Sequence, residues 1–135
     1  MAVEESNAFA SVRTLAKQLR QGQFTSVQLT EFFLDRLRRL GPKLNAVVTV
    51  TDDLALAAAR KADEELAAGL DRGPLHGIPY GAKDLLATVG APTCWGAAPF
   101  KNREIDADAT VIRRLRDAGA VLAAKLAMVE IAGGL

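Results

Sequence analysis

The sequence has few of the residues that form disulfides and transition-metal sites. Its 135 residues include one cysteine, Cys94, and one histidine, His76. An internal disulfide needs two cysteines, and a structural zinc site takes about four ligands, mainly cysteine and histidine. The composition therefore excludes both a disulfide framework and a zinc centre of this kind.

The charge is nearly balanced, and long apolar runs are missing. A total of 17 basic and 16 acidic residues give a formal net charge of +1 at pH 7. Nucleic acid and anionic membranes attract strongly basic surfaces, which this balance does not provide. A membrane-spanning helix needs about 18 or more apolar residues in a row, and a secretory leader pairs a basic segment with an apolar one. Neither pattern is seen, so we expect a soluble cytoplasmic protein with no direct nucleic-acid or membrane partner.

The remaining composition is that of a folded domain, with 50% hydrophobic and 24% charged residues. Apolar residues recur with helical spacing in four stretches, and three short apolar or β-branched runs predict strands. Strands that alternate with helices predict an α/β fold with a layered sheet. The expected helices cover 11–21, 25–40 (stopped by Gly41-Pro42), 53–68 and a stretch from Asp106 or Asp108 to 118; the strands cover 45–50, 78–82 and 120–124, and a short helical turn covers 128–132.

One lysine, Lys83, ends a short apolar strand that follows a turn rich in glycine and proline. Burying an ammonium group is costly, so a lysine in a dry cleft favours its neutral form and can act as a base. Gly77 and Gly81 remove bulk around this strand, and Pro79 does not suit a regular central strand. These features indicate the wall of a cleft and predict Lys83 as a catalytic base; the alternative is a surface lysine.

Three other polar residues are given structural interpretations. His76 lies in the turn, and because no serine or carboxylate partner is evident, we interpret it as a hydrogen-bonded turn residue. Asp84 follows Lys83, and neighbours on a strand point to opposite faces, so we interpret Asp84 as a carboxylate that orients the backbone. Lys125 ends the third strand and is expected to be solvated or to cap a helix.

Three blocks of the sequence, in order, resemble the amidase signature family. They are Gly-Pro-Leu-His-Gly-Ile-Pro-Tyr-Gly-Ala-Lys-Asp at 73–84, Ala-Pro-Thr-Cys-Trp-Gly at 91–96, and the stretch 108–125. The similarity runs from about residue 11 to residue 135 and implies an α/β fold, a mixed β-sheet covered by helices. This chain would form its N-terminal portion: an arm and helix pair over 1–41 and the start of the α/β core over 42–135.

The resemblance also implies a chemistry. Members of the family hydrolyse amides with a serine nucleophile, a cis-serine and a lysine, and that lysine matches Lys83. No metal or organic cofactor is implied, and the substrate would be a small-molecule amide. The family's Gly-Gly-Ser-Ser-Gly-Gly block would follow residue 134, and Ser6, Ser11 and Ser26 belong to the N-terminal segment. Catalytic groups of this kind act as a unit, so the chain alone is predicted to be inactive.

The subtype and two alternatives stay open. The A subunit of the tRNA-dependent amidotransferase is also similar, but it usually carries Asn-Met-Asp-Glu-Phe where this sequence has Ala-Met-Val-Glu-Ile at 127–131. This difference favours a general amidase over a fragment of a glutamyl-tRNA(Gln)/aspartyl-tRNA(Asn) amidotransferase A subunit. The other alternative is a non-catalytic remnant that acts as a binding or assembly module. Unpaired apolar strand edges further predict self-association, with a homodimer as one form.

Cys94, Trp95 and Met128 are weaker candidates for lining the pocket that receives the acyl group. Cys94 and Trp95 lie in a loop with nearby glycine and proline residues. A nucleophilic cysteine needs a nearby base, and the sequence indicates none for Cys94. Packing is the alternative role for each of the three.

Overall fold

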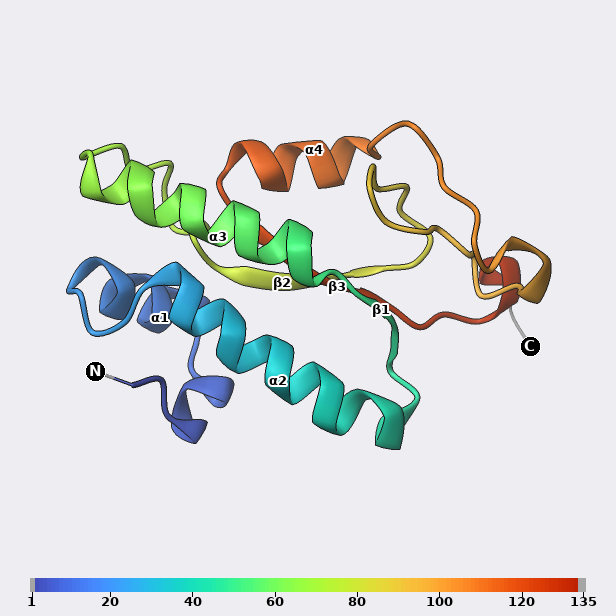
Figure 1. Ribbon diagram of the computed structural model, residues 1–135, viewed down its shortest axis with the longest axis horizontal. Coiled ribbons are helices and arrows are strands. Elements are labelled where there is room, and N and C mark those ends of the chain that lie inside the picture. The colour runs from blue at the N-terminus through green and yellow to red at the C-terminus, as the bar shows by residue number, and fades with distance from the viewer. Residues whose placement is uncertain (1, 134–135) are drawn as a thin grey trace.

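The computed structural model describes residues 2–133. Within that range the chain forms four α-helices, three β-strands and three short 3-10 turns (Figure 1). In order they are η1 (Glu5–Phe9), α1 (Val12–Arg20), α2 (Ser26–Leu44), β1 (Val47–Val50), α3 (Asp52–Ala67), β2 (Pro79–Lys83), η2 (Ala98–Phe100), α4 (Thr110–Asp117), β3 (Val121–Leu126) and η3 (Glu130–Ala132).

The three strands form one mixed sheet in the order β1-β3-β2. The outer strand β1 runs antiparallel to β3, with Val50 opposite Ala124. The other outer strand, β2, runs parallel to β3, with Pro79 opposite Val121 and Lys83 opposite Leu126. The predicted mixed sheet with covering helices is therefore confirmed. Because β2 and β3 are parallel, their carboxyl ends lie at the same end of the sheet.

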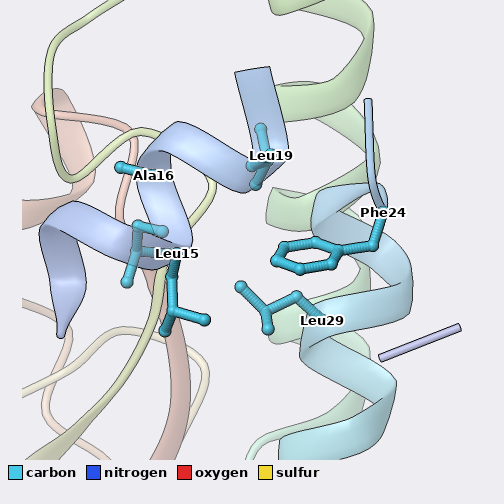
Figure 2. Close-up of a cluster of buried hydrophobic side chains, with 6 residues drawn as sticks. Leu15, Ala16, Leu19, Phe24 and Leu29 are labelled. Atoms are coloured by element: carbon cyan, nitrogen blue, oxygen red, sulfur yellow. The ribbon is translucent and has the colours of Figure 1, made fainter. Parts of the chain in front are cut away.

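The N-terminal helix pair forms as its sequence signals predict. The Ser11 side chain accepts a hydrogen bond from the Thr14 amide at the start of α1. Thr25 and Gln28 form a reciprocal capping box at the start of α2. Apolar side chains from both helices then pack together, and Figure 2 shows the Phe24 ring lying near Leu29 and facing α1. The buried members of this cluster are Leu15, Ala16, Leu19, Phe24, Leu29 and Ile78.

Small side chains let α3 pack closely on the sheet. Ala55 and Ala59 of α3 are fully buried, and they form one cluster with Leu34 of α2 and Val121 of β3. Figure 1 shows α2 and α3 side by side, and both helices contact β3. The alanine face of this helix is thus an interior face, and the central strand β3 lies beneath it.

The prediction that Gly41-Pro42 ends the second helix is wrong. α2 continues to Leu44 and ends at Asn45, which has a left-handed conformation with φ 50° and donates its amide to the Gly41 carbonyl. Pro42 lies in the last turn, where its missing N–H removes a single hydrogen bond of the ladder. Gly41 serves packing instead, because a Cβ there would stand 2.8 Å from Cγ2 of Val47.

The predicted aspartate cap of the fourth helix is also wrong. α4 begins after Ala109, which makes no side-chain cap. The Asp108 carboxylate instead accepts a hydrogen bond from the Val89 amide at 2.9 Å and pairs with Arg116. Asp108 thus joins the long loop before α4 to a residue near the end of that helix.

Candidate active site

The candidate site lies where the carboxyl ends of β2 and β3 meet. Lys83 is the last residue of β2, and the next amide, that of Asp84, donates to the Leu126 carbonyl of β3 at 2.9 Å. Lys83 is exposed and Asp84 is fully buried, so the two side chains occupy opposite faces, as predicted. In open α/β sheets, ligands bind outside the carboxyl ends of the strands. Lys83 therefore stands at the edge of the sheet where such sites occur.

The glycines around Lys83 serve packing rather than forming a cleft. A Cβ at Gly81 would stand 2.8 Å from Cδ1 of Leu126, and one at Gly77 would stand 3.1 Å from Oγ of Ser26. The Ser26 hydroxyl also donates to the Gly77 carbonyl at 2.8 Å. Neighbouring side chains thus fill the space that was attributed to a cleft. Within residues 2–133, Lys83 is exposed rather than set in the dry surroundings that its sequence context suggested.

A buried ion pair lies directly behind Lys83. Nζ of Lys125 is 3.0 Å from Oδ1 of Asp84, and both side chains are 0% exposed. The same ammonium donates to Oγ1 of Thr93 at 3.1 Å and to the Pro92 carbonyl at 3.3 Å. The expectation that Lys125 is solvated or caps a helix is therefore wrong. Lys125 is the next-to-last residue of the central strand β3, and the loop that carries Pro92 and Thr93 contacts its side chain there.

Asp84 also holds the backbone of this loop, as predicted. Its Oδ2 atom accepts a hydrogen bond from the Cys94 amide at 2.9 Å, and its carbonyl accepts one from the Trp95 amide at 3.3 Å. The chain turns sharply there, because Trp95 has φ 53° and Gly96 has φ 67°. One aspartate thus ties the end of β2 to the segment that carries two of the predicted pocket residues.

Cys94 is buried, and its thiol is engaged. Its Sγ donates to the Lys101 carbonyl at 3.0 Å. Burial, followed by the nearby Asp84 carboxylate, raises the pKa of the Cys94 thiol above its usual value. Because the thiolate is the reactive form, Cys94 is not activated as a nucleophile. It packs inside the loop, close to the candidate site.

Trp95 and Met128 are brought together by backbone contacts. The Ile131 amide of η3 donates to the Trp95 carbonyl at 2.7 Å. A Cβ at Gly96 would stand 2.7 Å from the Met128 carbonyl, so the two segments touch. The Arg103 guanidinium lies 3.8 Å from the centre of the Trp95 ring and covers it. In Figure 1 the red η3 segment lies beside the orange loop at one end of the molecule.

His76 lies at the opposite end of the sheet from Lys83, just before β2 begins. It is fully buried, its Nδ1 accepts a hydrogen bond from the Arg72 amide at 3.1 Å, and its Nε2 is 3.0 Å from Oε2 of Glu65. Arg72 also binds the Glu65 carboxylate through two nitrogens, and this hydrogen bonding lowers the Glu65 pKa. His76 is thus a hydrogen-bonded turn residue, as interpreted, but the expectation that it lacks a carboxylate partner is wrong. Glu65 comes from α3, and no local motif links the two residues.

Two other kinds of site are absent from residues 2–133. No cluster of three or more histidine, cysteine, aspartate or glutamate side chains in that range could hold a metal ion. None of the helices in the same range is long and apolar enough to cross a membrane.

A family model described as Amidase matches residues 28–135 of the chain. The chain belongs to the Amidase family. It is 45% identical over 127 residues to the protein named "Putative amidase AmiD" of Mycobacterium tuberculosis (strain ATCC 25618 / H37Rv), a match that covers 94% of this chain and 27% of that protein. It is 46% identical over 125 residues to the A subunit of glutamyl-tRNA(Gln) amidotransferase from Azoarcus sp. (strain BH72), covering 93% of this chain and 26% of that protein.

A solved structure of the family has the same fold over this region. The native peptide amidase from Stenotrophomonas maltophilia superimposes with a TM-score of 0.83 at 38% sequence identity. That match covers 88% of this chain and 25% of the peptide amidase. The chain therefore spans about a quarter of the length of its Amidase relatives.

Proposed function

We propose that this chain contributes the lysine base of an amidase that hydrolyses a carboxamide to a carboxylate and ammonia. The observation that carries the proposal is the position of Lys83, which follows the block 73–82 and ends β2 beside the carboxyl end of β3. Membership of the Amidase family supports the reaction class. The serine nucleophile and the cis-serine would come from the part of the relatives that this chain does not span.

In the proposed mechanism Lys83 moves one proton. Neutral Lys83 takes a proton from the cis-serine as that residue takes one from the nucleophilic serine, whose oxygen attacks the amide carbon. The proton then passes to the departing nitrogen, which leaves as ammonia, and water hydrolyses the acyl-enzyme. In the part of the chain that the structure describes, residues 2–133, the Lys83 side chain is exposed. The dry surroundings that keep a lysine neutral would therefore be supplied by the segment that carries the serines.

The test uses the whole reading frame that encodes this sequence, expressed at its natural length. Ammonia release from a panel of carboxamides is measured for the wild type, Lys83→Ala and Lys61→Ala. Lys61 is a matched control, because it lies on α3 with a side chain that is 70% exposed. We expect Lys83→Ala to lower kcat by about 10²–10⁴-fold, as removal of a general base does, and Lys61→Ala to leave it unchanged.

Near-normal turnover by Lys83→Ala would exclude Lys83 as the base. A wild-type protein that releases no ammonia from any carboxamide would count against the amidase itself and favour a binding or assembly module.

The amidotransferase component is a second candidate. It is favoured by the 46% identity to the Azoarcus protein, which is as high as the 45% identity to the mycobacterial relative. In this case ammonia would be passed to a partner that activates tRNA-bound acyl groups. Purification of the tagged protein from its own cells separates the candidates. A stoichiometric partner that copurifies would indicate the amidotransferase, and an enzyme that is active on amides without a partner would indicate the general amidase.

A further inference from the structure

We propose that Lys125 is a positioning residue, which holds the loop 92–96 and the end of β2 in the arrangement that Lys83 needs for the reaction. This inference rests on the proposed function. It concerns a residue that does not touch the substrate and that acts through Asp84 and through the loop. The geometry of the buried pair carries the argument.

The Lys125 ammonium has three oxygen neighbours, which come from two segments. Oδ1 of Asp84 lies 3.0 Å from Nζ, Oγ1 of Thr93 lies 3.1 Å away and the Pro92 carbonyl lies 3.3 Å away. The contacts to Thr93 and Pro92 are hydrogen bonds, and the contact to Asp84 is an ion pair. Both charged side chains have an exposed fraction of 0%, so the pair is shielded from bulk solvent.

Asp84 of this pair adjoins the candidate base Lys83 in sequence and also binds the backbone of the loop 92–96. Asp84 is the next residue after Lys83, so fixing Asp84 fixes the backbone from which Lys83 projects. The other carboxylate oxygen of Asp84 accepts the Cys94 amide at 2.9 Å, and its carbonyl accepts the Trp95 amide at 3.3 Å. Two of the predicted pocket residues, Cys94 and Trp95, and the candidate base are therefore positioned by the same aspartate, which Lys125 contacts.

Stability alone does not account for such a pair. Burying two charges costs about as much as their attraction returns, and well-packed apolar residues in the same place are often as stable or more stable. What the ion pair supplies is a fixed geometry, because each charged group accepts only a few neighbours at defined distances. Displacing a catalytic group by about 1 Å can slow a reaction about 10²-fold. A rigid support directly behind Lys83 is thus suited to this function.

The test measures the loop and the reaction separately, in the protein encoded by the whole reading frame. The variants are Lys125→Met, the double variant Asp84→Asn/Lys125→Met, Thr93→Val and Thr93→Ser. The double variant leaves no unpaired buried charge, so it keeps the proposal testable where Lys125→Met fails to fold. Asp35→Asn is the matched control, since it breaks the exposed pair of Asp35 and Arg39 on α2.

Hydrogen exchange of the amides at 93–95 reports the loop without requiring any activity. We expect exchange there to become about tenfold faster in the double variant, since bonds to a charged group are lost, and to stay unchanged in Asp35→Asn. Thr93→Val should give a smaller increase, and Thr93→Ser should restore wild-type exchange because it keeps the hydroxyl. Unchanged exchange in the double variant would overturn the proposal, whether or not the protein is an amidase.

Kinetics then distinguish positioning from stability. We expect kcat of the double variant to fall about 10–100-fold with KM within about threefold, at a temperature where the variant is fully folded. Thr93→Ser should retain wild-type kcat. A double variant with loosened exchange and wild-type kcat would overturn the positioning role. An inactive wild type would count against the proposed function instead, and the exchange result alone would then decide whether Lys125 holds the loop.

Discussion

The imidazole ring of His76 packs directly against the backbone of Gly119. A Cβ built at residue 119 would overlap Cδ2 of His76 and stand 2.9 Å from its Cγ. Gly119 also has φ 78°, a conformation that favours glycine, and its carbonyl accepts the Gly77 amide at 2.8 Å. This contact joins the turn before β2 to the turn before β3. It therefore sets the start of the two parallel strands whose other ends form the candidate site.

We predict that Gly119→Ala destabilises the fold by more than the backbone strain alone. A left-handed conformation costs a non-glycine residue about 1–2 kcal/mol, and overpacking against His76 adds about 1–3 kcal/mol. The matched control is Gly22→Ala, because Gly22 has φ 69° but no atom lies within 4 Å of its built Cβ. Urea denaturation gives both free energies of unfolding. An equal decrease in the free energy of unfolding in the two variants would show that the His76 ring moves aside without destabilising the fold.

The sequence alone was a sound guide where the interactions are local. The capping box of Thr25 and Gln28 and the serine cap of α1 involve residues three positions apart, so the pattern itself contains both partners. The alternation of strands and helices likewise predicted the layered α/β fold. Helix ends were less predictable, because Pro42 in a last turn removes only one hydrogen bond and tertiary contacts outweigh that loss.

The buried polar contacts were not predictable in this way. Lys125 and Asp84 belong to different strands, and only the fold shows that they meet. His76 and Glu65 also come from different elements. Residue type alone would predict an exposed Lys125, since lysine is seldom fully buried. Two features of the sequence pointed toward the buried pair. Lys125 follows a run of apolar residues that is typical of a buried strand, and Asp84 adjoins the candidate base Lys83.

Tyr80 provides a test of the burial on β2. Desolvation, and then the Asp108 carboxylate, raises the pKa of Tyr80 to about 12 from a normal 10.0. The folded protein thus disfavours tyrosinate, so stability from this group is fully present below pH 10 and is lost as the pH rises toward 12. As Tyr80 is the only tyrosine in this sequence, the tyrosinate absorbance of the 135-residue chain reports it alone. Ionisation near pH 10 in folded protein would contradict the burial, and Tyr80→Phe serves as the blank.

Cys94 is predicted to be slow to react with thiol reagents. Cys94 is 6% exposed, and its thiol donates a hydrogen bond to the Lys101 carbonyl. Burial also raises the pKa of this thiol. We expect a thiol-specific chromogenic reagent to modify the native chain at least about tenfold more slowly than the urea-unfolded chain at pH 8, since the thiolate is the reactive form. Lys101 contributes only its backbone carbonyl to this contact, so Lys101→Ala is a control that should leave the rate unchanged. Modification of the native chain as fast as that of the unfolded chain would show an open loop.

In the described sheet, β1 and β2 each have one neighbour, so each leaves one edge of backbone groups unpaired by β3. Exposed strand edges with apolar side chains pair with other chains, and a lysine on such an edge opposes that pairing. We therefore expect the 135-residue chain, expressed alone, to self-associate and to melt with low cooperativity.

Val48→Lys on β1 should shift the sedimentation profile of this chain toward monomer. Val48 is 42% exposed, and the matched control Val111→Lys alters a valine of 43% exposure on helix α4. Because the two substitutions add the same charge to equally exposed positions, only an effect of the strand edge separates them. If both variants dissociate equally, net charge rather than edge pairing governs the association. A monodisperse wild-type monomer with a sharp melt would show that three strands and their helices suffice as a stable unit.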